Sequence, residues 1–320
     1  MIPQGPDPSA PEPKRHAVVY SDDYIVDIGA HVFPVAKYAL IVDRLIEEGA
    51  IDRAEILAPP PATREELLLV HTPEYLDDLL STRWTPRTIR SELPLTAELV
   101  AASILTAGGT TLAAREAVAR RGFGLHIGGG FHHAFAGHAE GFCYINDIAV
   151  AIRTLQHEGA VGRAAVVDCD VHQGNGTARI FQDDPTVFTF SIHQQYNYPM
   201  KEQSTIDIGL DDGATDEEYL EALATVLPRL DVFRPELILY VAGADPFRED
   251  YLGGLGLTKE GLARRDEMIL QYCGDRALPV AAVLAGGYAQ DTNDTVEIHV
   301  TTCRKVIETA RRAGAVREQR

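Results

Sequence analysis

The chain has 320 residues, of which 45% are hydrophobic, and its formal net charge is −18 at pH 7. This acidity argues against a nucleic-acid partner, because a phosphate backbone requires clustered Lys and Arg. It is compatible with cationic partners such as lysine-rich segments or polyamines, or with nothing more than solubility. No long apolar run or secretory pattern is evident, so we expect no membrane partner and a cytoplasmic location. Four cysteines without a Cys-x-x-Cys pair are expected to be free thiols.

Residues 1–15 carry five prolines and are expected to form a disordered or extended leader. A single domain is expected to follow over residues 16–320. Its first elements are predicted to be a strand at 16–21, a helix at 35–48, one or two helices within 65–80, an irregular loop at 84–94, and a long alanine-rich helix at 96–121.

From residue 123 onward, strands and helices are predicted to alternate. The strands are at 123–127, 164–171, 187–193, 237–243 and 279–285. The helices are at 145–158, 176–182, 216–232, 258–272 and 292–313. This alternation predicts an α/β fold, a three-layer αβα sandwich with a mostly parallel central sheet.

A metal site is predicted at the end of the strand at 164–171. Asp168, Asp170 and His172 occupy alternate positions, so they point to the same side while the backbone stays extended. Carboxylate and imidazole ligands suit a catalytic zinc, which keeps one coordination position open. Asp245 is the best candidate for a third ligand, because ligand sites gather beyond the carboxyl ends of parallel strands. Taken alone, an Asp-x-His more often caps or hydrogen-bonds a strand end.

Three further side chains follow predicted strands. His132 and His133 come after a run of three glycines and could form a proton-transfer pair, because the imidazole pKa lies near neutrality. Tyr288 follows the last strand, where its phenol could donate a hydrogen bond to a developing oxyanion. Each could alone be ordinary packing, but their place beside a predicted metal site favours a catalytic role.

At this point the sequence resembles the arginase/deacetylase superfamily, specifically the zinc-dependent histone deacetylases and their bacterial relatives, from about residue 18 to about residue 310. The matching motifs are His-Ile-Gly-Gly-Gly-Phe-His-His at 126–133, Gly-Phe-Cys-Tyr-Ile-Asn-Asp at 141–147, Asp-Cys-Asp-Val-His-Gln-Gly-Asn-Gly at 168–176, Gly-Ala-Asp at 243–245 and Gly-Gly-Tyr at 286–288. The forms of the first and third motifs are most similar to class IV deacetylases.

The resemblance implies the arginase/deacetylase fold and a zinc-dependent lysine deacylase. The implied zinc ligands are Asp170, His172 and Asp245. The implied catalytic residues are His132 and His133, which act on the attacking water and the leaving amine, Tyr288, which polarises the acyl carbonyl, and Asp168 and Asn175, which orient the two histidines. Many family members have Asp at the position of Asn175. Because a neutral amide stabilises imidazolium less than a carboxylate does, we predict a lower pKa for His133 than for His132.

The resemblance also implies a structural potassium ion. Its implied oxygen donors come from Asp168, Asp170, His172, Ser191 and Ile192, and a second such site would involve Phe181 and Val187.

An acyl-lysine tunnel is implied as well. Its walls are expected to include Gly141, Phe142 and an aromatic ring from Tyr196 or Tyr198, although Phe142 could be plain core. Leu252 stands where polyamine-specific relatives carry a gatekeeper glutamate, which weakens the polyamine alternative.

The expected reaction is hydrolysis of an N-ε-acyl-lysine amide, with an acetyl or a longer fatty acyl group. An acetylpolyamine or other small-molecule amidohydrolase is the alternative. A binuclear enzyme of the arginase type would need further carboxylates where Gly174 and Phe247 stand. A binding module without activity is disfavoured by the intact histidine pair and tyrosine.

Overall fold

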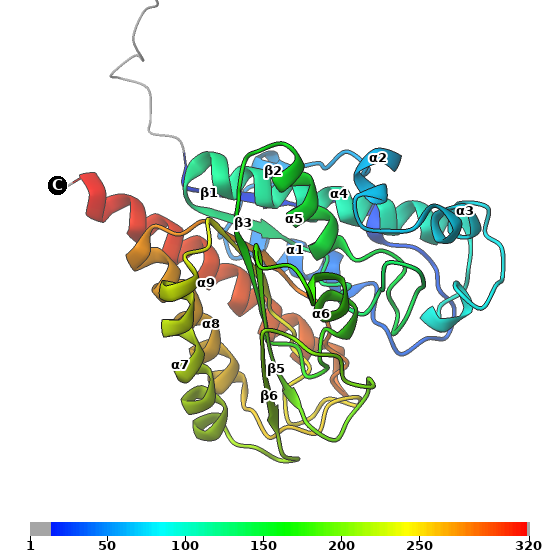
Figure 1. Ribbon diagram of the computed structural model, residues 1–320. Helices are drawn as coiled ribbons and strands as arrows, with labels where there is room; N and C mark the ends of the chain where they lie inside the picture. The colour runs from blue at the N-terminus through cyan, green and yellow to red at the C-terminus, as the bar shows by residue number, and fades with distance from the viewer. Residues whose placement is uncertain (1–13, 319–320) are drawn as a thin grey trace, which may run out of the picture.

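The computed structural model describes residues 14–318, so most of the expected leader over 1–15 lies outside the described residues. Within this part of the chain, eight strands form one sheet in the order β2-β1-β3-β8-β7-β4-β5-β6, and every neighbouring pair is parallel (Figure 1). The strands are β1 (His16–Val19), β2 (Ile56–Leu57), β3 (Phe123–His126), β4 (Ala164–Asp168), β5 (Val187–Gln194), β6 (Ile206–Leu210), β7 (Leu237–Val241) and β8 (Val280–Val283).

Helices cover both faces of the sheet. They are α1 (Lys37–Glu47), α2 (Arg64–Leu68), α3 (Pro73–Leu80), α4 (Ala97–Arg120), α5 (Asp147–His157), α6 (Asn175–Phe181), α7 (Asp216–Phe233), α8 (Lys259–Arg276) and α9 (Thr292–Glu318), with short 3-10 helices at Asp22–Tyr24, Arg53–Glu55 and Ile89–Ser91. The predicted three-layer αβα architecture is confirmed, with a sheet that is parallel throughout.

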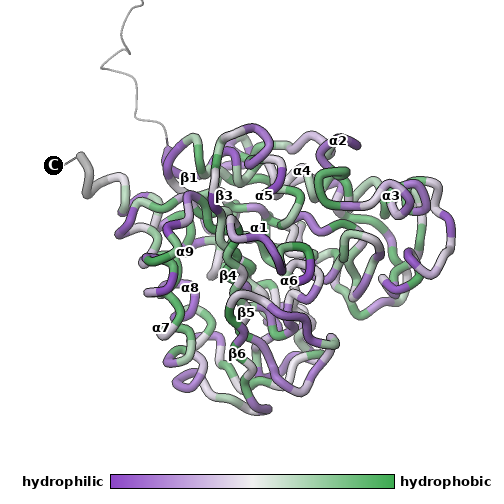
Figure 2. The backbone as a smooth tube through the Cα atoms, in the orientation of Figure 1, coloured by the Kyte–Doolittle hydropathy of each residue, from purple (hydrophilic) through white to green (hydrophobic). Residues whose placement is uncertain are grey.

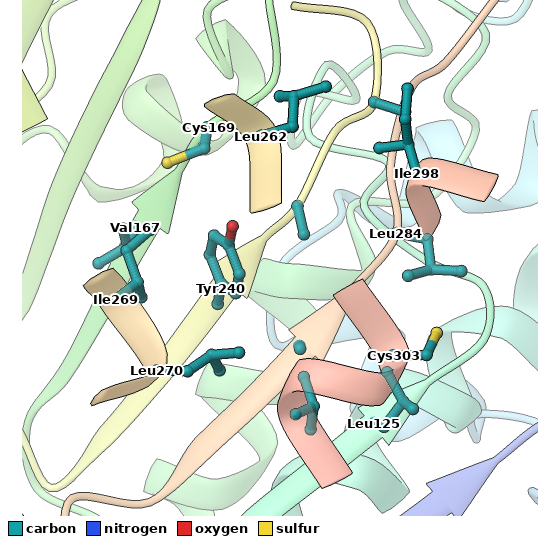
Figure 3. Packing of buried hydrophobic residues seen from close by; sticks show 14 of the residues in the cluster. Leu125, Val167, Cys169, Tyr240, Leu262, Ile269, Leu270, Leu284, Ile298 and Cys303 are labelled. Atoms are coloured by element: carbon teal, nitrogen blue, oxygen red, sulfur yellow. The ribbon is translucent and has the colours of Figure 1, made fainter. Parts of the chain in front are cut away.

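Each face of the sheet has its own apolar core. Helices α1, α7, α8 and α9 pack on one face, where Val167 and Tyr240 of the sheet belong to the same buried cluster as Ile269 and Leu270 of α8 and Cys303 of α9 (Figure 3). Helices α4, α5 and α6 pack on the other face. The tube coloured by hydropathy shows the apolar strands running between amphipathic helices (Figure 2).

Most element boundaries follow local signals. The threonines 96, 215 and 258 each accept a backbone hydrogen bond at the start of α4, α7 and α8, respectively, which is the usual way of satisfying a free helical N–H. The sequence did not predict β2, which is only two residues long, or β6. In β6, Asp207 and Gly209 interrupt the apolar residues because this strand lies at the edge of the sheet.

Helix α4 is, among the described helices, the one long and apolar enough to cross a membrane by length and composition. Residues such as Ala113, Ala114 and Ala117 are fully buried against the sheet and α5. The apolar composition of this helix is therefore accounted for by packing inside the protein.

Candidate active site

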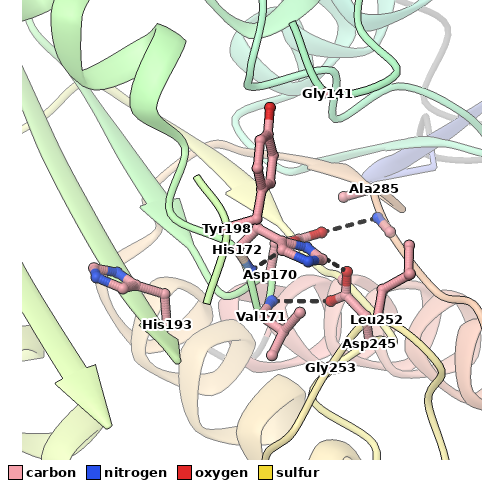
Figure 4. A network of polar contacts seen from close by, with 12 residues as sticks. Gly141, Asp170, Val171, His172, His193, Tyr198, Asp245, Leu252, Gly253 and Ala285 are labelled. Atoms are coloured by element: carbon pink, nitrogen blue, oxygen red, sulfur yellow. Dashed lines mark hydrogen bonds and ion pairs between the residues drawn. The ribbon is translucent and has the colours of Figure 1, made fainter. Parts of the chain in front are cut away.

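The three predicted metal ligands lie together at the carboxyl edge of the sheet. Asp170 and His172 follow β4, and Asp245 follows the neighbouring strand β7. One potential ligand atom from each lies within 4.8 Å of the other two, and all three residues are buried. Figure 4 shows the three side chains pointing toward one another. Among the described residues no other group of three or more His, Cys, Asp or Glu side chains has this geometry.

The backbone that carries these ligands is a turn and not the extended strand that the sequence predicted. Strand β4 ends at Asp168, so alternation along a strand does not explain the convergence. The N–H of His172 donates to Oδ1 of Asp170 at 2.9 Å, and the N–H of Val171 donates to Oδ1 of Asp245 at 2.9 Å. These bonds fold the turn around the carboxylates and join the loops that follow β4 and β7.

The donor set fits a metal ion such as zinc, which accepts nitrogen and oxygen ligands. Oδ2 of Asp245 is buried and accepts no hydrogen bond from the described residues. Nδ1 of His172 lies 3.4 Å from it. A methyl group on Gly286 would lie 2.0 Å from the same oxygen, so glycine at this position keeps the space open. A buried carboxylate oxygen that accepts no hydrogen bond and faces an imidazole nitrogen suits a cation held between the two side chains.

The charges at the three residues are strongly coupled. Burial, reinforced by the neighbouring Asp170, raises the pKa of Asp245 to about 7. Burial would lower the pKa of His172, but its contacts with Asp170 and Asp245 raise it to about 10. The positive charge of the His172 imidazolium therefore offsets part of the negative charge of the two carboxylates. Because a metal ligand must be deprotonated, metal binding here would release a proton.

The two adjacent histidines share a polar contact beside the three ligands. Nε2 of His132 lies 3.1 Å from Nε2 of His133, while Nδ1 of His132 lies 2.7 Å from Asp168 and Nδ1 of His133 lies 2.8 Å from Asn175. Burial lowers the pKa of His132, but Asp168 and Asp170 outweigh it and raise the value to about 9. Burial and the neighbouring His132 hold the pKa of His133 well below its usual value.

This order of the two pKa values agrees with the prediction, although the main cause is different. The prediction was based on the weak electrostatic effect of a neutral Asn175. In the structure, burial is the main cause, and the hydrogen bond to Asn175 raises the pKa of His133.

Tyr288 lies in the same pocket and is positioned by a residue that the sequence did not single out. Asp250 accepts a hydrogen bond from the backbone N–H of Tyr288 at 2.6 Å and others from the N–H groups of Leu252 and Gly253. The phenol ring lines the pocket together with the histidine pair and residues Asp170 and His172. Burial raises the pKa of the phenol well above its usual value, so the hydroxyl keeps its proton.

The expected tunnel residues fall into two groups. Gly141 and Phe142 line the pocket, and the half-buried Phe142 ring lies 6.0 Å from that of Tyr288, so it is not plain core. The Tyr198 ring stands 5.2 Å from that of His133, whereas Tyr196 is 80% exposed. The structure therefore places Tyr198, and not Tyr196, beside the histidines.

Leu252 is the remaining residue that was expected at the tunnel. It does not line the pocket, and its carbonyl accepts a hydrogen bond from Asn197, the residue before Tyr198, at 2.8 Å. Figure 4 shows its side chain on the side of Asp245.

A second cavity lies beside the pocket. The cavity is lined mainly by apolar side chains, including Ile28 and Leu93. Phe33, Phe131 and Phe142 line both spaces and form a shared aromatic wall. No sequence pattern singled out Phe33, which lies in an irregular segment before α1.

The residues expected around potassium also lie near β4. Ser191 pairs with Asp168 across strands β5 and β4, and Ile192 follows it in β5. The Ser191 hydroxyl lies 2.9 Å from Nδ1 of His193. Phe181 and Val187, expected at the second cation site, are buried at the end of α6 and the start of β5.

Gly174 and Phe247 stand where a second metal ion would need carboxylate ligands. A methyl group on Gly174 would lie 2.3 Å from Oδ2 of Asp168, so a carboxylate could not replace this glycine without movement. Phe247 is buried in the apolar core.

Two buried cations close to the site were not predicted. Nζ of Lys37 donates to the carbonyl of Ala285 at 2.7 Å, and burial lowers the pKa of this lysine to about 8. The Arg265 guanidinium donates to the carbonyls of Cys169 and Gly243, at 3.3 and 2.6 Å. Those carbonyls precede Asp170 and Asp245 by one and two residues, so Arg265 braces both loops that carry the predicted metal ligands.

A family model for the histone deacetylase domain matches residues 31–303. The chain belongs to the histone deacetylase family. Among solved structures, this family member is similar to a histone deacetylase homologue complexed with SAHA, with 27% identity, a TM-score of 0.79, and coverage of 92% of this chain and 84% of that one. It is also similar to the HD domain of HDA15, with 26% identity, a TM-score of 0.77 and coverage of 93% and 88%.

Sequence relatives agree with this assignment. The histone deacetylase-family chain is 43% identical over 286 residues to an uncharacterized protein of Picosynechococcus, covering 88% of this chain and 95% of the relative. It is 31% identical to histone deacetylase 2 of Arabidopsis thaliana, with coverage of 86% and 75%, and 33% identical to the acetoin utilization protein AcuC of Bacillus subtilis, with coverage of 81% and 73%. Membership indicates a hydrolase that acts on amides.

Proposed function

We propose that this protein is a zinc-dependent lysine deacylase that hydrolyses N-ε-acyl-lysine to lysine and a carboxylate. The observation that carries the proposal is that a histidine pair and a tyrosine line one pocket with Asp170 and His172, and that Asp245 completes a buried triad with these two residues. We further propose that the catalytic domain spans residues 16–320, that it acts in the cytoplasm, and that it is of the class IV type.

The triad would hold the zinc ion. When bound, zinc acts as a Lewis acid on the carbonyl and lowers the pKa of water. The chain's own residues manage the protons. Nε2 of His133 receives the proton of the attacking water, and the histidine pair returns a proton to the leaving amine. Asp168 and Asn175 hold the far nitrogens of the two rings.

Tyr288 would stabilise the developing charge. Its hydroxyl stays protonated because burial raises its pKa, so it can donate a hydrogen bond to the tetrahedral oxyanion. Phe142 and Tyr198 would flank the aliphatic part of the lysine side chain. The net charge of −18 favours a cationic substrate and disfavours a nucleic acid.

The length of the acyl group would depend on the aromatic wall. The pocket at the triad suits a short acyl group such as acetyl. The apolar cavity behind Phe33 has the composition that a longer fatty chain would require. Both acyl classes are therefore included in the proposal.

A small-molecule amidohydrolase acting on acetylpolyamines is the second candidate. The acidic net charge favours it, but Leu252 offers no carboxylate for a second ammonium group.

The deciding experiment is a panel of lysine peptides carrying acyl chains of increasing length, together with N-acetylspermidine. Each substrate is assayed before and after chelation and after readdition of zinc. We expect turnover of the peptides, loss with chelator and recovery with zinc. Turnover of acetylspermidine alone would favour the second candidate, and activity that survives complete metal removal would contradict the proposed mechanism.

We also propose a structural potassium ion at Asp168, Asp170, His172, Ser191 and Ile192. The pairing of Ser191 with Asp168 supports it, because it brings a hydroxyl-bearing residue alongside a buried carboxylate residue at the end of β4. Thermal unfolding should occur at a higher temperature in potassium chloride than in choline chloride. Equal midpoints would contradict this site.

A further inference from the structure

Glu140 is a third residue in the row of contacts that begins with His133 and Asn175. This residue is 8% exposed and lies in the segment between the three glycines at 128–130 and α5. Its Oε1 accepts a hydrogen bond from Nδ2 of Asn175 at 2.8 Å. Its Oε2 lies 2.8 Å from the guanidinium of Arg90 and 3.3 Å from Nε2 of His138. Donors therefore surround both oxygens, which favours the ionised carboxylate.

These contacts fix the orientation of the Asn175 amide. A carboxylate can only accept hydrogen bonds, so the NH₂ group of Asn175 must face Glu140. The amide oxygen then faces His133, and Oδ1 lies 2.8 Å from its Nδ1. An amide oxygen also only accepts, so Nδ1 of His133 must carry a hydrogen.

The orientation of the amide determines which ring nitrogen can act as a base. A neutral imidazole has one N–H. With that hydrogen on Nδ1, Nε2 of His133 keeps its lone pair and faces Nε2 of His132 at 3.1 Å. If the amide were free to rotate by half a turn, its NH₂ group could donate to Nδ1 and favour the opposite tautomer.

We propose that Glu140 is a positioning residue that locks the Asn175 amide and thereby holds His133 as the Nδ1–H tautomer, with the lone pair on Nε2. Where Asp stands at position 175, a carboxylate contacts the histidine directly. Here the carboxylate of Glu140 acts on His133 through the amide of Asn175. The consequence for turnover rests on the proposed deacylase function, whereas the tautomer itself does not.

The test is the tautomeric state of His133 in the full-length protein labelled with ¹⁵N-histidine. Long-range ¹H–¹⁵N correlation spectra distinguish a nitrogen with a lone pair from one that carries hydrogen, and a His133→Gln variant identifies the signal. We expect the Nδ1–H pattern in the wild-type protein. In Glu140→Met, which removes the acceptor at similar volume, we expect signal from the Nε2–H tautomer and a kcat lower by roughly 10-fold to 100-fold.

A rescue variant separates positioning from simple structural damage. In Glu140→Met/Asn175→Asp, a carboxylate at position 175 accepts directly from Nδ1 of His133. The Nδ1–H pattern should return, and kcat should recover with it. Glu65→Met makes the same substitution at an exposed site on α2 and should change neither readout.

A wild-type protein with hydrogen on Nε2 of His133 would overturn the proposal even if no single variant folded. So would a folded Glu140→Met protein with the wild-type pattern. Absence of any deacylase activity would contradict the proposed function and leave the tautomer measurement valid.

Discussion

The proposed catalytic role of Tyr288 depends on its hydroxyl group, whereas its ring also serves in packing. The ring contacts Phe33 and Phe142, with centroids 6.1 and 6.0 Å away, and Asp250 holds its backbone. Loss of the hydroxyl would leave all of these contacts in place. The contribution of the oxygen can therefore be measured separately from that of the ring.

Tyr288→Phe should lower kcat by roughly 100-fold to 1,000-fold, as removal of one oxyanion donor does elsewhere. Bound zinc and the thermal midpoint should stay at wild-type values, because the ring and the metal-binding residues are unchanged. Tyr251→Phe is the matched control, since Tyr251 is 65% exposed. Unchanged turnover in Tyr288→Phe would show that the phenol does not stabilise the oxyanion.

Phe33 allows a second test at the scale of one side chain. Phe33→Ala removes part of the wall shared by the pocket and the apolar cavity. The ratio of kcat/KM for decanoyl-lysine to that for acetyl-lysine should rise, because a long chain would gain room and an acetyl group would not. Phe233→Ala, at an equally half-buried ring on α7, should leave the ratio unchanged. A lower ratio in Phe33→Ala would contradict a role for the cavity in accepting acyl chains.

At the scale of elements, helix α8 stabilises two loops that belong to different strands. Arg265 is fully buried, pairs with Asp266 at 2.8 Å and donates to the backbone carbonyls of both metal-binding loops. Asp266 in turn accepts hydrogen bonds from Tyr240 of β7 and Thr302 of α9. The geometry of the triad thus depends on a helix that contributes no ligand.

Arg265→Met should weaken zinc binding by roughly 10-fold to 100-fold, because the carbonyls before Asp170 and Asp245 lose their shared donor. It should also lower the free energy of unfolding by about 3–5 kcal/mol, since Asp266 would remain buried without its partner. Competition with a chromophoric chelator measures the first effect, and urea unfolding measures the second. The control is Arg264→Met, at the adjacent exposed position. Wild-type zinc affinity in a folded Arg265→Met protein would contradict the bracing role.

At the scale of the whole molecule, buried neutral histidines link stability to pH. Burial lowers the pKa of His71 to about 4, while its ring makes hydrogen bonds with the Phe135 carbonyl and the Asn146 N–H. Between about pH 6.5 and pH 4 the unfolded chain binds a proton at this site and the folded chain does not. Stability from His71 is therefore present above pH 6.5 and is lost as the pH falls through this range.

The size of this pH dependence is set by the single proton that the unfolded chain binds at the histidine. Each such histidine should contribute a slope of about 1.4 kcal/mol per pH unit to the free energy of unfolding in that range. His71→Gln should lower stability at neutral pH and reduce the slope by up to this amount. His157→Gln, at an exposed position, should leave the slope as it is in the wild type. Urea unfolding at several values between pH 4.5 and 7 measures both quantities, and an unchanged slope in His71→Gln would contradict the assignment.

The local sequence determined the layered fold and most of the candidate site. Apolar runs alternating with amphipathic segments predict a parallel sheet between helices, and in such a sheet all strands end at one edge. The polar residues after those strands, such as His132, Asp170, Asp245 and Tyr288, were therefore expected to meet. The prediction needed only the positions of the strands and not their order.

Tertiary structure decided which distant side chains complete the site. Glu140, Lys37, Phe33 and Arg265 lie in segments whose local patterns indicate nothing more than a loop or an ordinary helix. They reach the site because α1 and α8 pack on the sheet and the segment before α5 folds behind the histidines. Their environment comes from residues far away in the chain, and periodicity over a few residues carries no information about such contacts. Sequence thus determined where chemistry would gather, and packing determined how its charges and hydrogen bonds are set.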